Sequence, residues 1–177
     1  LPDRLERRSN PVTVVRPPDR GPGFIERGSA RFGERTRANL KIQEGCSFFC
    51  SYCIVPYARG PARSRNWDDI LREARDLIAR GHRELVLTGV NIASFADHGR
   101  DVADLTAALL ALPGEFRLRL SSTEPGPVVT RLIDLMAQDP RLCRFLHLPL
   151  QYGEDQILAA MNRRYRVADY AALAWKA

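Results

Sequence analysis

Residues 41–60 read Lys41-Ile-Gln-Glu-Gly-Cys46-Ser-Phe-Phe-Cys50-Ser-Tyr-Cys53-Ile-Val-Pro-Tyr-Ala-Arg-Gly60, a predicted strand that runs into a loop with three cysteines. The spacing of these cysteines is C-x3-C-x2-C. Buried structural cysteines do not cluster in this way, so the pattern predicts a metal site. A structural zinc site has four protein ligands in a closed tetrahedron, and three thiolates leave one coordination position without a protein donor. Chemistry at a metal requires an open position of this kind.

The other candidate ligands do not complete a zinc site. The fourth thiol, Cys143, and the histidines His82, His98 and His147 stand far along the chain, and none has a finger-like spacing from the triplet. Iron-sulfur clusters are also bound by thiolates, and they can leave one iron free for a small molecule such as S-adenosylmethionine (SAM). The pattern therefore favours an iron-sulfur cluster, with zinc or a set of core cysteines as the alternatives.

The cysteine motif, with Tyr52 directly before the third cysteine, resembles the signature of the radical SAM superfamily. Four further segments make the resemblance more specific. Two flank the motif, IQEGC at 42–46 and IVPYARGPARSR at 54–65, and two lie farther along the chain, LTGVNI at 87–92 and RLSSTEP at 119–125. Together these motifs are similar to the methylthiotransferases, most closely to the branch that acts on threonylcarbamoyladenosine in tRNA. The resemblance covers about residues 39–170.

The resemblance implies that residues after each predicted strand bind the cluster or SAM. It implies a 4Fe-4S cluster, with one iron free for the amino and carboxylate groups of SAM, held by Cys46, Cys50 and Cys53. It implies contacts to SAM from Tyr52, Gly89, Asn91, Ser121, Ser122 and Gln151. Without the resemblance, ordinary turns would explain the residues after the strands as well as contacts to SAM do. Packing that shields the cluster loop from water would explain Tyr52 as well as a contact to SAM does.

The function that the resemblance implies is methylthiolation of threonylcarbamoyladenosine in tRNA. One SAM would donate a methyl group to sulfur and a second would be the radical source, with flavodoxin or ferredoxin as electron donor. The sister branch that acts on isopentenyladenosine and the branch that modifies a ribosomal-protein aspartate are near alternatives. A metal-stabilised binding module without catalysis is the alternative from another class.

Arginines follow the cysteine loop and recur near the end of the chain. We expect the first group at the catalytic rim, where it offers donors to a substrate carboxylate or to tRNA phosphates, and the second group to contact phosphates. As isolated charge runs, both groups read as solvated surface. The two groups are Arg59, Arg63 and Arg65, and Arg163, Arg164 and Arg166.

Composition places the chain among globular proteins. It has 177 residues, 45% of them hydrophobic, and a net charge of +6, which permits nucleic-acid binding without requiring it. No apolar run reaches the roughly 18 residues that a membrane span needs. An oxygen-sensitive cluster and unpaired thiols suit a reducing compartment, so we expect a cytoplasmic protein that does not contact membranes.

Short strands alternate with amphipathic helices from residue 39 onward, the pattern of parallel β/α units. The predicted strands are 39–45, 84–88, 116–121 and 144–150, and the predicted helices are 67–80, 101–112, 127–138 and 154–162, with another from Val167. Three of the four strands alternate apolar and polar residues, as expected where one face packs on helices and the other lines a polar lumen. An open antiparallel sheet with one wet face is the alternative.

We therefore predict two regions. Residues 1–38, rich in Arg, Pro and Gly, read as an interdomain linker, and residues 39–177 as a radical SAM core, a partial (β/α) barrel of about four units that is truncated at its carboxyl end. In the resembling family, an amino-terminal domain carries a second 4Fe-4S cluster and a carboxyl-terminal domain binds RNA. We expect the chain alone to be incompetent for the full reaction.

Overall fold

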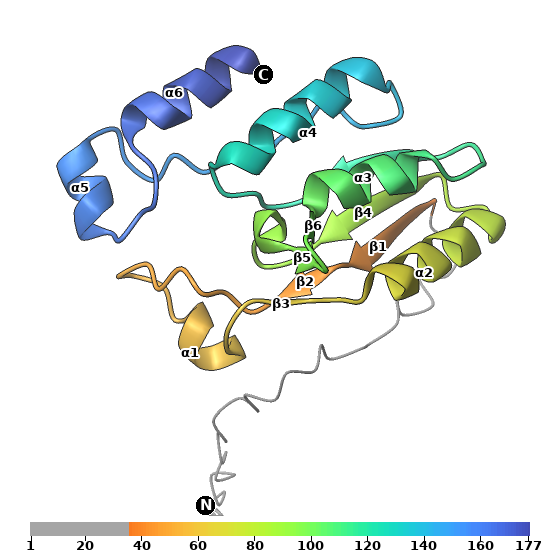
Figure 1. Ribbon diagram of the computed structural model, residues 1–177, viewed down its shortest axis with the longest axis horizontal. Helices are drawn as coiled ribbons and strands as arrows, with labels where there is room; N and C mark the ends of the chain where they lie inside the picture. The colour runs from red at the N-terminus through yellow and green to blue at the C-terminus, as the bar shows by residue number, and fades with distance from the viewer. Residues whose placement is uncertain (1–35) are drawn as a thin grey trace, which may run out of the picture.

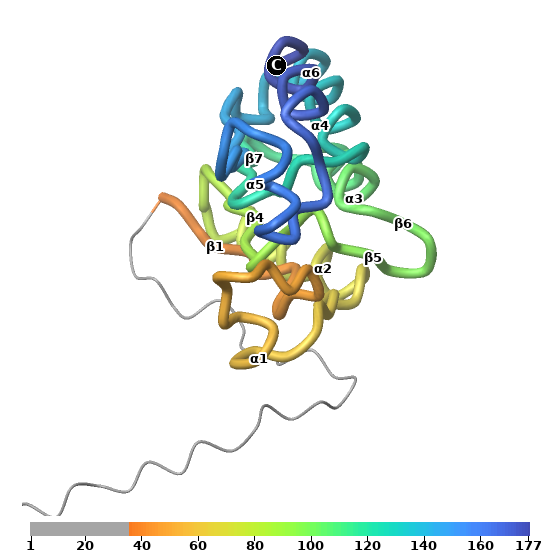
Figure 2. Tube along the Cα trace, turned by 90° about the vertical axis from the view of Figure 1, so that its left-hand side faces the viewer, coloured from red at the N-terminus to blue at the C-terminus, as the bar shows by residue number. Residues whose placement is uncertain are grey.

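A three-stranded parallel sheet forms the centre of the protein, whose computed structural model describes residues 36–177. The strands β1 (Arg37–Lys41), β4 (Glu84–Thr88) and β7 (Arg117–Leu120) lie in that order, and β1 and β7 both run parallel to β4. Parallel neighbours need crossover connections, which contain helices α2 (Trp67–Ala79) and α3 (Val102–Leu110). Figure 1 shows this alternation, and Figure 2 shows the three strands side by side. The predicted parallel α/β class is confirmed.

One face of the sheet forms the hydrophobic core with α2 and α3. The strands contribute six buried residues to this core, and Ile42, directly after β1, joins them. The strand residues are Ala38, Leu40, Leu85, Leu87, Leu118 and Leu120. The helices contribute Ile70, Ala74, Leu105 and Leu109 to the same cluster. Asn39 and Arg117, which alternate with these buried positions, are exposed. The alternation that the sequence predicts for these strands therefore separates a packed face from a polar one.

The polar face centres on Glu84, whose side chain is 6% exposed. Its carboxylate accepts bonds from Arg37 of β1 at 2.8 Å, and from Arg117 and Arg119 of β7 at 3.2 and 3.0 Å. Burial acts to raise the pKa of Glu84, but the bond from Arg119 and the charges of the three arginines outweigh it and hold the pKa below its usual range. One carboxylate thus ties all three strands together.

We predict that Glu84→Gln destabilises the fold by about 2 kcal/mol, because a hydrogen bond to a charged group contributes roughly 1.5–3 kcal/mol. Since the pKa of Glu84 is lowered on folding, its contribution is present above the usual glutamate value and is lost as pH falls through the lowered value. Urea unfolding at neutral and acidic pH measures both effects. Glu115→Gln is the control, because Glu115 pairs with Arg83 while 89% exposed and should change stability by less than about 0.5 kcal/mol. Equal losses in both variants would contradict the prediction.

Helix ends follow signals that are visible in the sequence. The side chain of Asn66 accepts two backbone amides of the first turn of α2, and Gly81, with a φ of 87°, follows its last turn. Asp101 and Asp104 form a capping box at the start of α3. Helix α4 (Pro127–Gln138) begins with proline, where no amide hydrogen is needed. The helices predicted at 67–80 and 127–138 are confirmed.

The fourth strand predicted at 144–150 does not form. Residues 142–147 meet β7 and the segment after it through two isolated parallel bridges, Leu142 with Leu118 of β7 and His147 with Ser122 beyond the end of β7. Between them the amide of Phe145 bonds the carbonyl of Cys143 instead of a neighbouring strand, so the ladder is interrupted. The described residues therefore contain three laddered parallel strands where the sequence predicted four.

The strand predicted at 39–45 is divided into the end of β1 and the separate strand β2 (Gln43–Glu44), and short elements that the sequence analysis did not predict lie after the cysteines and after β4. Strand β2 pairs antiparallel with β3 (Arg63–Ser64), and helix α1 (Val55–Arg59) lies between them in the chain. The 3-10 helix η1 and a two-stranded hairpin follow β4, with the bounds Ile92–Ser94 for η1, Ala96–Asp97 for β5 and Arg100–Asp101 for β6.

Helices α5 (Asp155–Ala160) and α6 (Val167–Lys176) complete the described chain, within the ranges predicted for them. Residues 1–35 of the predicted linker, 1–38, lie outside the described residues. Of the remaining three, Arg37 and Ala38 belong to β1. No helix within residues 36–177 has the length and hydrophobicity needed to cross a bilayer.

Candidate functional site

Three segments lie beyond the carboxyl ends of the sheet strands. Residues 89–91 follow β4 and residues 121–124 follow β7, whereas the cysteine loop, residues 46–53, follows β1 by way of the short strand β2, which pairs with β3 outside the sheet (Figure 1). In parallel β/α folds, ligands and reacting groups gather at this edge. The structure therefore brings most of the predicted site residues to one side of the molecule.

Cys46, Cys50 and Cys53 are free thiols, of which Cys50 is buried and the other two are half-buried. The amide of Cys46 donates to the carbonyl of Gly60 at 3.1 Å, and the amide of Cys53 donates to the carbonyl of Cys50 at 3.0 Å. Burial raises the pKa of Cys46, and the sulfur groups of Cys50 and Cys53 raise it further. The three sulfur groups thus lie close enough to interact electrostatically.

Within residues 36–177, no three His, Cys, Asp or Glu side chains converge as ligands of one metal ion. An iron-sulfur cluster does not need such convergence, because its cysteines bind different iron atoms. Three neighbouring thiols on one loop, at an edge that also carries unpaired polar groups, fit a cluster with a bound polar ligand.

Two of the predicted SAM contacts have buried polar atoms without a partner among the described residues. Asn91 is 3% exposed, and its Oδ1 accepts the amide of Ala93 at 3.1 Å while its Nδ2 is unpaired. The Oγ of Ser121, just after β7, is also buried and unpaired. Buried polar groups are nearly always hydrogen-bonded. A donor on Asn91 and a hydroxyl on Ser121 therefore suit a polar ligand at this edge.

Gln43 organises the same edge, and sequence reasoning missed it. Its side chain is fully buried; Oε1 accepts the amides of Val90 and Asn91 at 3.0 Å each, and Nε2 donates to the carbonyls of Glu44 and Gly45 at 2.7 and 2.8 Å. One amide thus joins β2, the cysteine loop and the turn after β4. The sequence did contain a signal for this role, because Gln43 directly follows the apolar Ile42 and lies three residues before Cys46.

Gly89 and Ser122 have contacts that explain them without a ligand. A Cβ at Gly89 would lie 2.9 Å from Oε1 of Gln43, so only glycine allows this close approach. The carbonyl of Ser122 accepts the amide of Ile92 at 3.1 Å, and Ser122 bridges to His147. Contacts from Gly89 and Ser122 to SAM stay predictions.

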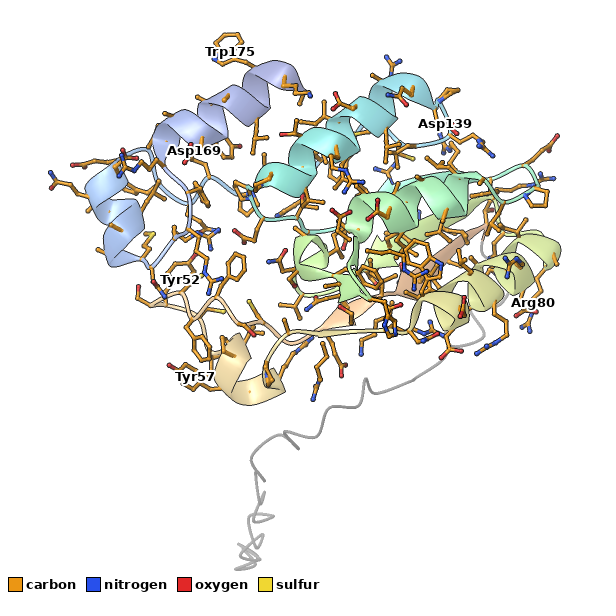
Figure 3. The ribbon with its side chains drawn as sticks, viewed as in Figure 1. Tyr52, Tyr57, Arg80, Asp139, Asp169 and Trp175 are labelled. Atoms are coloured by element: carbon orange, nitrogen blue, oxygen red, sulfur yellow. The ribbon has the colours of Figure 1, made fainter. Side chains whose placement is uncertain are left out.

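Tyr52 and Gln151 lie on the exposed side of the site. Tyr52 is 54% exposed, and its hydroxyl lies 3.3 Å from Nη1 of Arg163. Figure 3 shows Tyr52 of the cysteine loop beside the chain that leaves α5. Gln151 is exposed and has a φ of 69°, in the left-handed region. Their contacts to SAM also stay predictions.

The segment after α5, residues 161–165, holds the cysteine loop from the other side, and we call it the clasp. The sequence analysis did not predict this contact. Its bonds run from the amide of Ser51 to the carbonyl of Met161 at 3.1 Å, from Nδ2 of Asn162 to the carbonyls of Phe48 and Phe49 at 3.1 and 3.0 Å, and from Nη2 of Arg164 to the carbonyl of Ser47 at 2.8 Å. The loop is therefore fixed by residues more than a hundred positions away in the chain, for example 114 between Asn162 and Phe48.

Several arginines predicted to meet tRNA or a substrate carboxylate are engaged inside the protein. Arg63 pairs with Glu44 at 2.9 Å and Arg65 pairs with Glu73, and the two arginine side chains are 11% and 10% exposed. Arg163 is 3% exposed and also pairs with a carboxylate. For these three arginines the predicted contact with tRNA or a substrate carboxylate is wrong. A buried cation requires a compensating anion, and in this fold each of the three pairs with a carboxylate of the protein. The exposed members of the set are Arg59, Arg164 and Arg166.

Comparison with known proteins identifies the family to which this site belongs. Residues 40–175 match the Radical SAM superfamily. The chain belongs to the radical SAM superfamily. This match spans the sheet, the cysteine loop and the clasp, and it confirms the resemblance that the cysteine motif indicated.

Similar curated sequences within this superfamily are tRNA-modifying enzymes. The chain is 40% identical over 161 residues to a tRNA-2-methylthio-N(6)-dimethylallyladenosine synthase of Alkaliphilus oremlandii, covering 89% of this chain and 34% of the relative. It is 43% identical over 142 residues to the enzyme of that name in Dehalococcoides mccartyi, covering 77% and 33%. It is 36% identical over 146 residues to a threonylcarbamoyladenosine tRNA methylthiotransferase of Bacillus subtilis, covering 79% and 32%. The chain thus spans about a third of the length of these relatives.

Solved radical SAM structures share the fold. A radical SAM methyltransferase from Kitasatospora setae, with tryptophan substrate and a SAM analogue bound, has a TM-score of 0.63 at 19% identity, over 85% of this chain and 28% of its own. A cobalamin-dependent SAM radical enzyme with aqua-cobalamin and SAM bound has a TM-score of 0.61 at 13% identity, over 76% and 21%. At these identities the likeness concerns the fold alone.

Proposed function

We propose that this chain is the cluster-binding part of a radical SAM methylthiotransferase that modifies an adenosine of tRNA. The observation that carries the proposal is the likeness, at 36–43% identity over 77–98% of this chain, to relatives named for methylthio modification of tRNA adenosines. The geometry of the cysteine loop and of the polar groups beside it supports the same proposal.

Cys46, Cys50 and Cys53 would hold the 4Fe-4S cluster. Together, the cluster and SAM supply a carbon-centred radical that can remove a hydrogen atom from an unactivated carbon. The chain fixes three thiols on one clasped loop. It also presents the buried Nδ2 of Asn91 and Oγ of Ser121, which would bind the polar groups of SAM and orient it.

The other parts of the proposal concern the whole protein and rest on the family likeness. They are a second 4Fe-4S cluster in a further domain, an electron donor such as flavodoxin or ferredoxin, and a cytoplasmic location. The described residues form three parallel strands, and the relatives are about three times as long. We therefore expect methylthiolation to require the complete gene product.

For the substrate, we propose the dimethylallyl (isopentenyl) form of adenosine over the threonylcarbamoyl form that the sequence motifs favoured. The argument for threonylcarbamoyl was that arginines after the cysteine loop would bind its carboxylate. Arg63 and Arg65 are instead neutralised by Glu44 and Glu73, so that argument now rests on Arg59 alone. Relatives in Alkaliphilus oremlandii, Polynucleobacter asymbioticus and Dehalococcoides mccartyi, at 40–43% identity, carry the dimethylallyl name.

We predict that the complete gene product, expressed in cells that lack their own methylthiotransferases, adds a methylthio group to dimethylallyladenosine in tRNA. Nucleoside mass spectrometry of the tRNA measures this gain, and the Cys50→Ala variant should show none. A gain only on threonylcarbamoyladenosine would reverse the choice of substrate. No gain on either nucleoside would reject tRNA methylthiolation, and stoichiometric zinc without acid-labile sulfide would point to a binding module.

A further inference from the structure

Arg163 of the clasp makes an interaction that its neighbours do not. Its Nη1 lies 3.1 Å from the sulfur of Cys50 and 3.3 Å from the hydroxyl of Tyr52, and its Nη2 bonds the carboxylate of Glu124. The ring of Tyr165 lies 5.1 Å from its guanidinium carbon. A single cation thus joins the cysteine loop, the segment after β7 and the clasp.

The surroundings of Arg163 fix its position and its charge. Its side chain is 3% exposed, and a buried guanidinium needs an anionic partner. Glu124 is that partner: burial acts to lower the pKa of Arg163, but the negative charge of Glu124, together with the interactions with Tyr165 and Cys50, outweighs it and the pKa is raised. Burial raises the pKa of Glu124 while Arg163 opposes that rise. The pair holds the planar donor fork against Cys50, which a point charge such as lysine would do less well.

We propose that Arg163 is a positioning residue that donates a charge-assisted hydrogen bond to the Cys50 sulfur and raises the reduction potential of the cluster held there. This inference rests on the proposed cluster. Hydrogen bonds to ligand sulfurs and nearby positive charge are among the factors that set the potentials of iron-sulfur clusters. A cation that donates to a ligand sulfur stabilises the extra negative charge of the reduced form, so the cluster accepts an electron more readily.

Arg164 provides a matched control. It also holds the cysteine loop, through the carbonyl of Ser47 at 2.8 Å and the ring of Phe48 at 4.4 Å, so it contacts backbone and ring atoms of the loop where Arg163 contacts sulfur. If the clasp acts only by holding the loop, loss of either arginine should alter the cluster similarly. If the bond to sulfur sets the potential, only the loss of Arg163 should alter the cluster.

The test is a redox titration of the anaerobically reconstituted chain, with the reduced cluster followed by electron paramagnetic resonance after iron has been counted. For Arg163→Gln, we expect the ratio of reduced to oxidised cluster at a fixed potential to fall by about tenfold, which for a one-electron couple is a shift of about 59 mV to more negative values. Arg164→Gln should stay within about twofold of the wild type, which is less than about a third of that shift in potential. Arg163→Lys, which keeps the charge but not the fork, should lie between the wild type and Arg163→Gln.

The outcomes separate this inference from the proposed function. A wild-type chain that binds no iron would overturn the cluster itself. If the wild type binds iron, equal shifts in Arg163→Gln and Arg164→Gln, or no shift in either, would overturn the role of Arg163. If Arg163→Gln fails to retain iron, Arg163→Lys decides: a lowered potential supports the proposal, and an unchanged one rejects it.

Discussion

Cys50→Ala is expected to abolish iron binding after anaerobic reconstitution, whereas Cys143→Ala is expected to leave the iron content unchanged. Cys50 is buried in the loop that also carries Cys46 and Cys53. A cluster bound through three cysteines loses a third of its protein ligands when one is removed, and no spare thiol lies in that loop.

Cys143 is the matched control because it is buried and free but lies elsewhere. Its amide bonds the carbonyl of Leu118, within β7, whereas the site gathers beyond the end of that strand. Counting iron and acid-labile sulfide in both variants measures the effect. Similar iron loss from both would mean that Cys143 is a ligand and that the assignment of the loop is wrong.

Gly45→Ala is expected to disrupt the entrance to the cysteine loop and to destabilise the fold by about 3 kcal/mol or more, from left-handed strain and from overpacking. Gly45 has a φ of 67°, and a Cβ there would lie 2.0 Å from the carbonyl oxygen of Pro61 and 2.7 Å from that of Gly60. Both are backbone atoms that cannot move without shifting the amide of Cys46, which bonds the carbonyl of Gly60.

Gly81→Ala separates the two causes of this loss. Gly81 has a φ of 87°, but a Cβ at this position would have no atom within 4 Å, so alanine there meets only the left-handed strain of about 1 kcal/mol. Urea unfolding of the two variants and the wild type measures the difference. A Gly45→Ala loss no larger than that of Gly81→Ala would show that the loop entrance adjusts to the extra methyl group.

Local signals in the sequence predicted the secondary structure well where one signal dominated. Helix α4 has the range predicted for it, which opens on proline, and α2 ends one residue before its predicted range, next to Gly81. The strand at 144–150 failed because alternation along a chain does not show whether a partner offers a continuous edge. Within this range only His147 forms a bridge, and its partner Ser122 lies beyond the end of β7.

The candidate site divides in the same way. The cysteine spacing and the polar residues after each strand were visible in the sequence, and Asn91 and Ser121 prove to have unpaired buried atoms. The arginines were also visible, but their partners were not. Arg63 and Arg65 read as surface charges or ligand donors until the fold placed Glu44 and Glu73 beside them.

By itself the sequence determined the cysteine loop, the parallel β/α class and the helix ends, because these depend on spacing, periodicity and capping within a few residues. Only the tertiary structure decided that Gln43 binds the turn after β4, 47 and 48 residues away, and that Arg163 reaches the sulfur of Cys50 across 113 residues. Such contacts depend on which strand ends meet and on which charges are buried together. Local patterns carry no record of either, since both follow from how the sheet and the clasp pack in space.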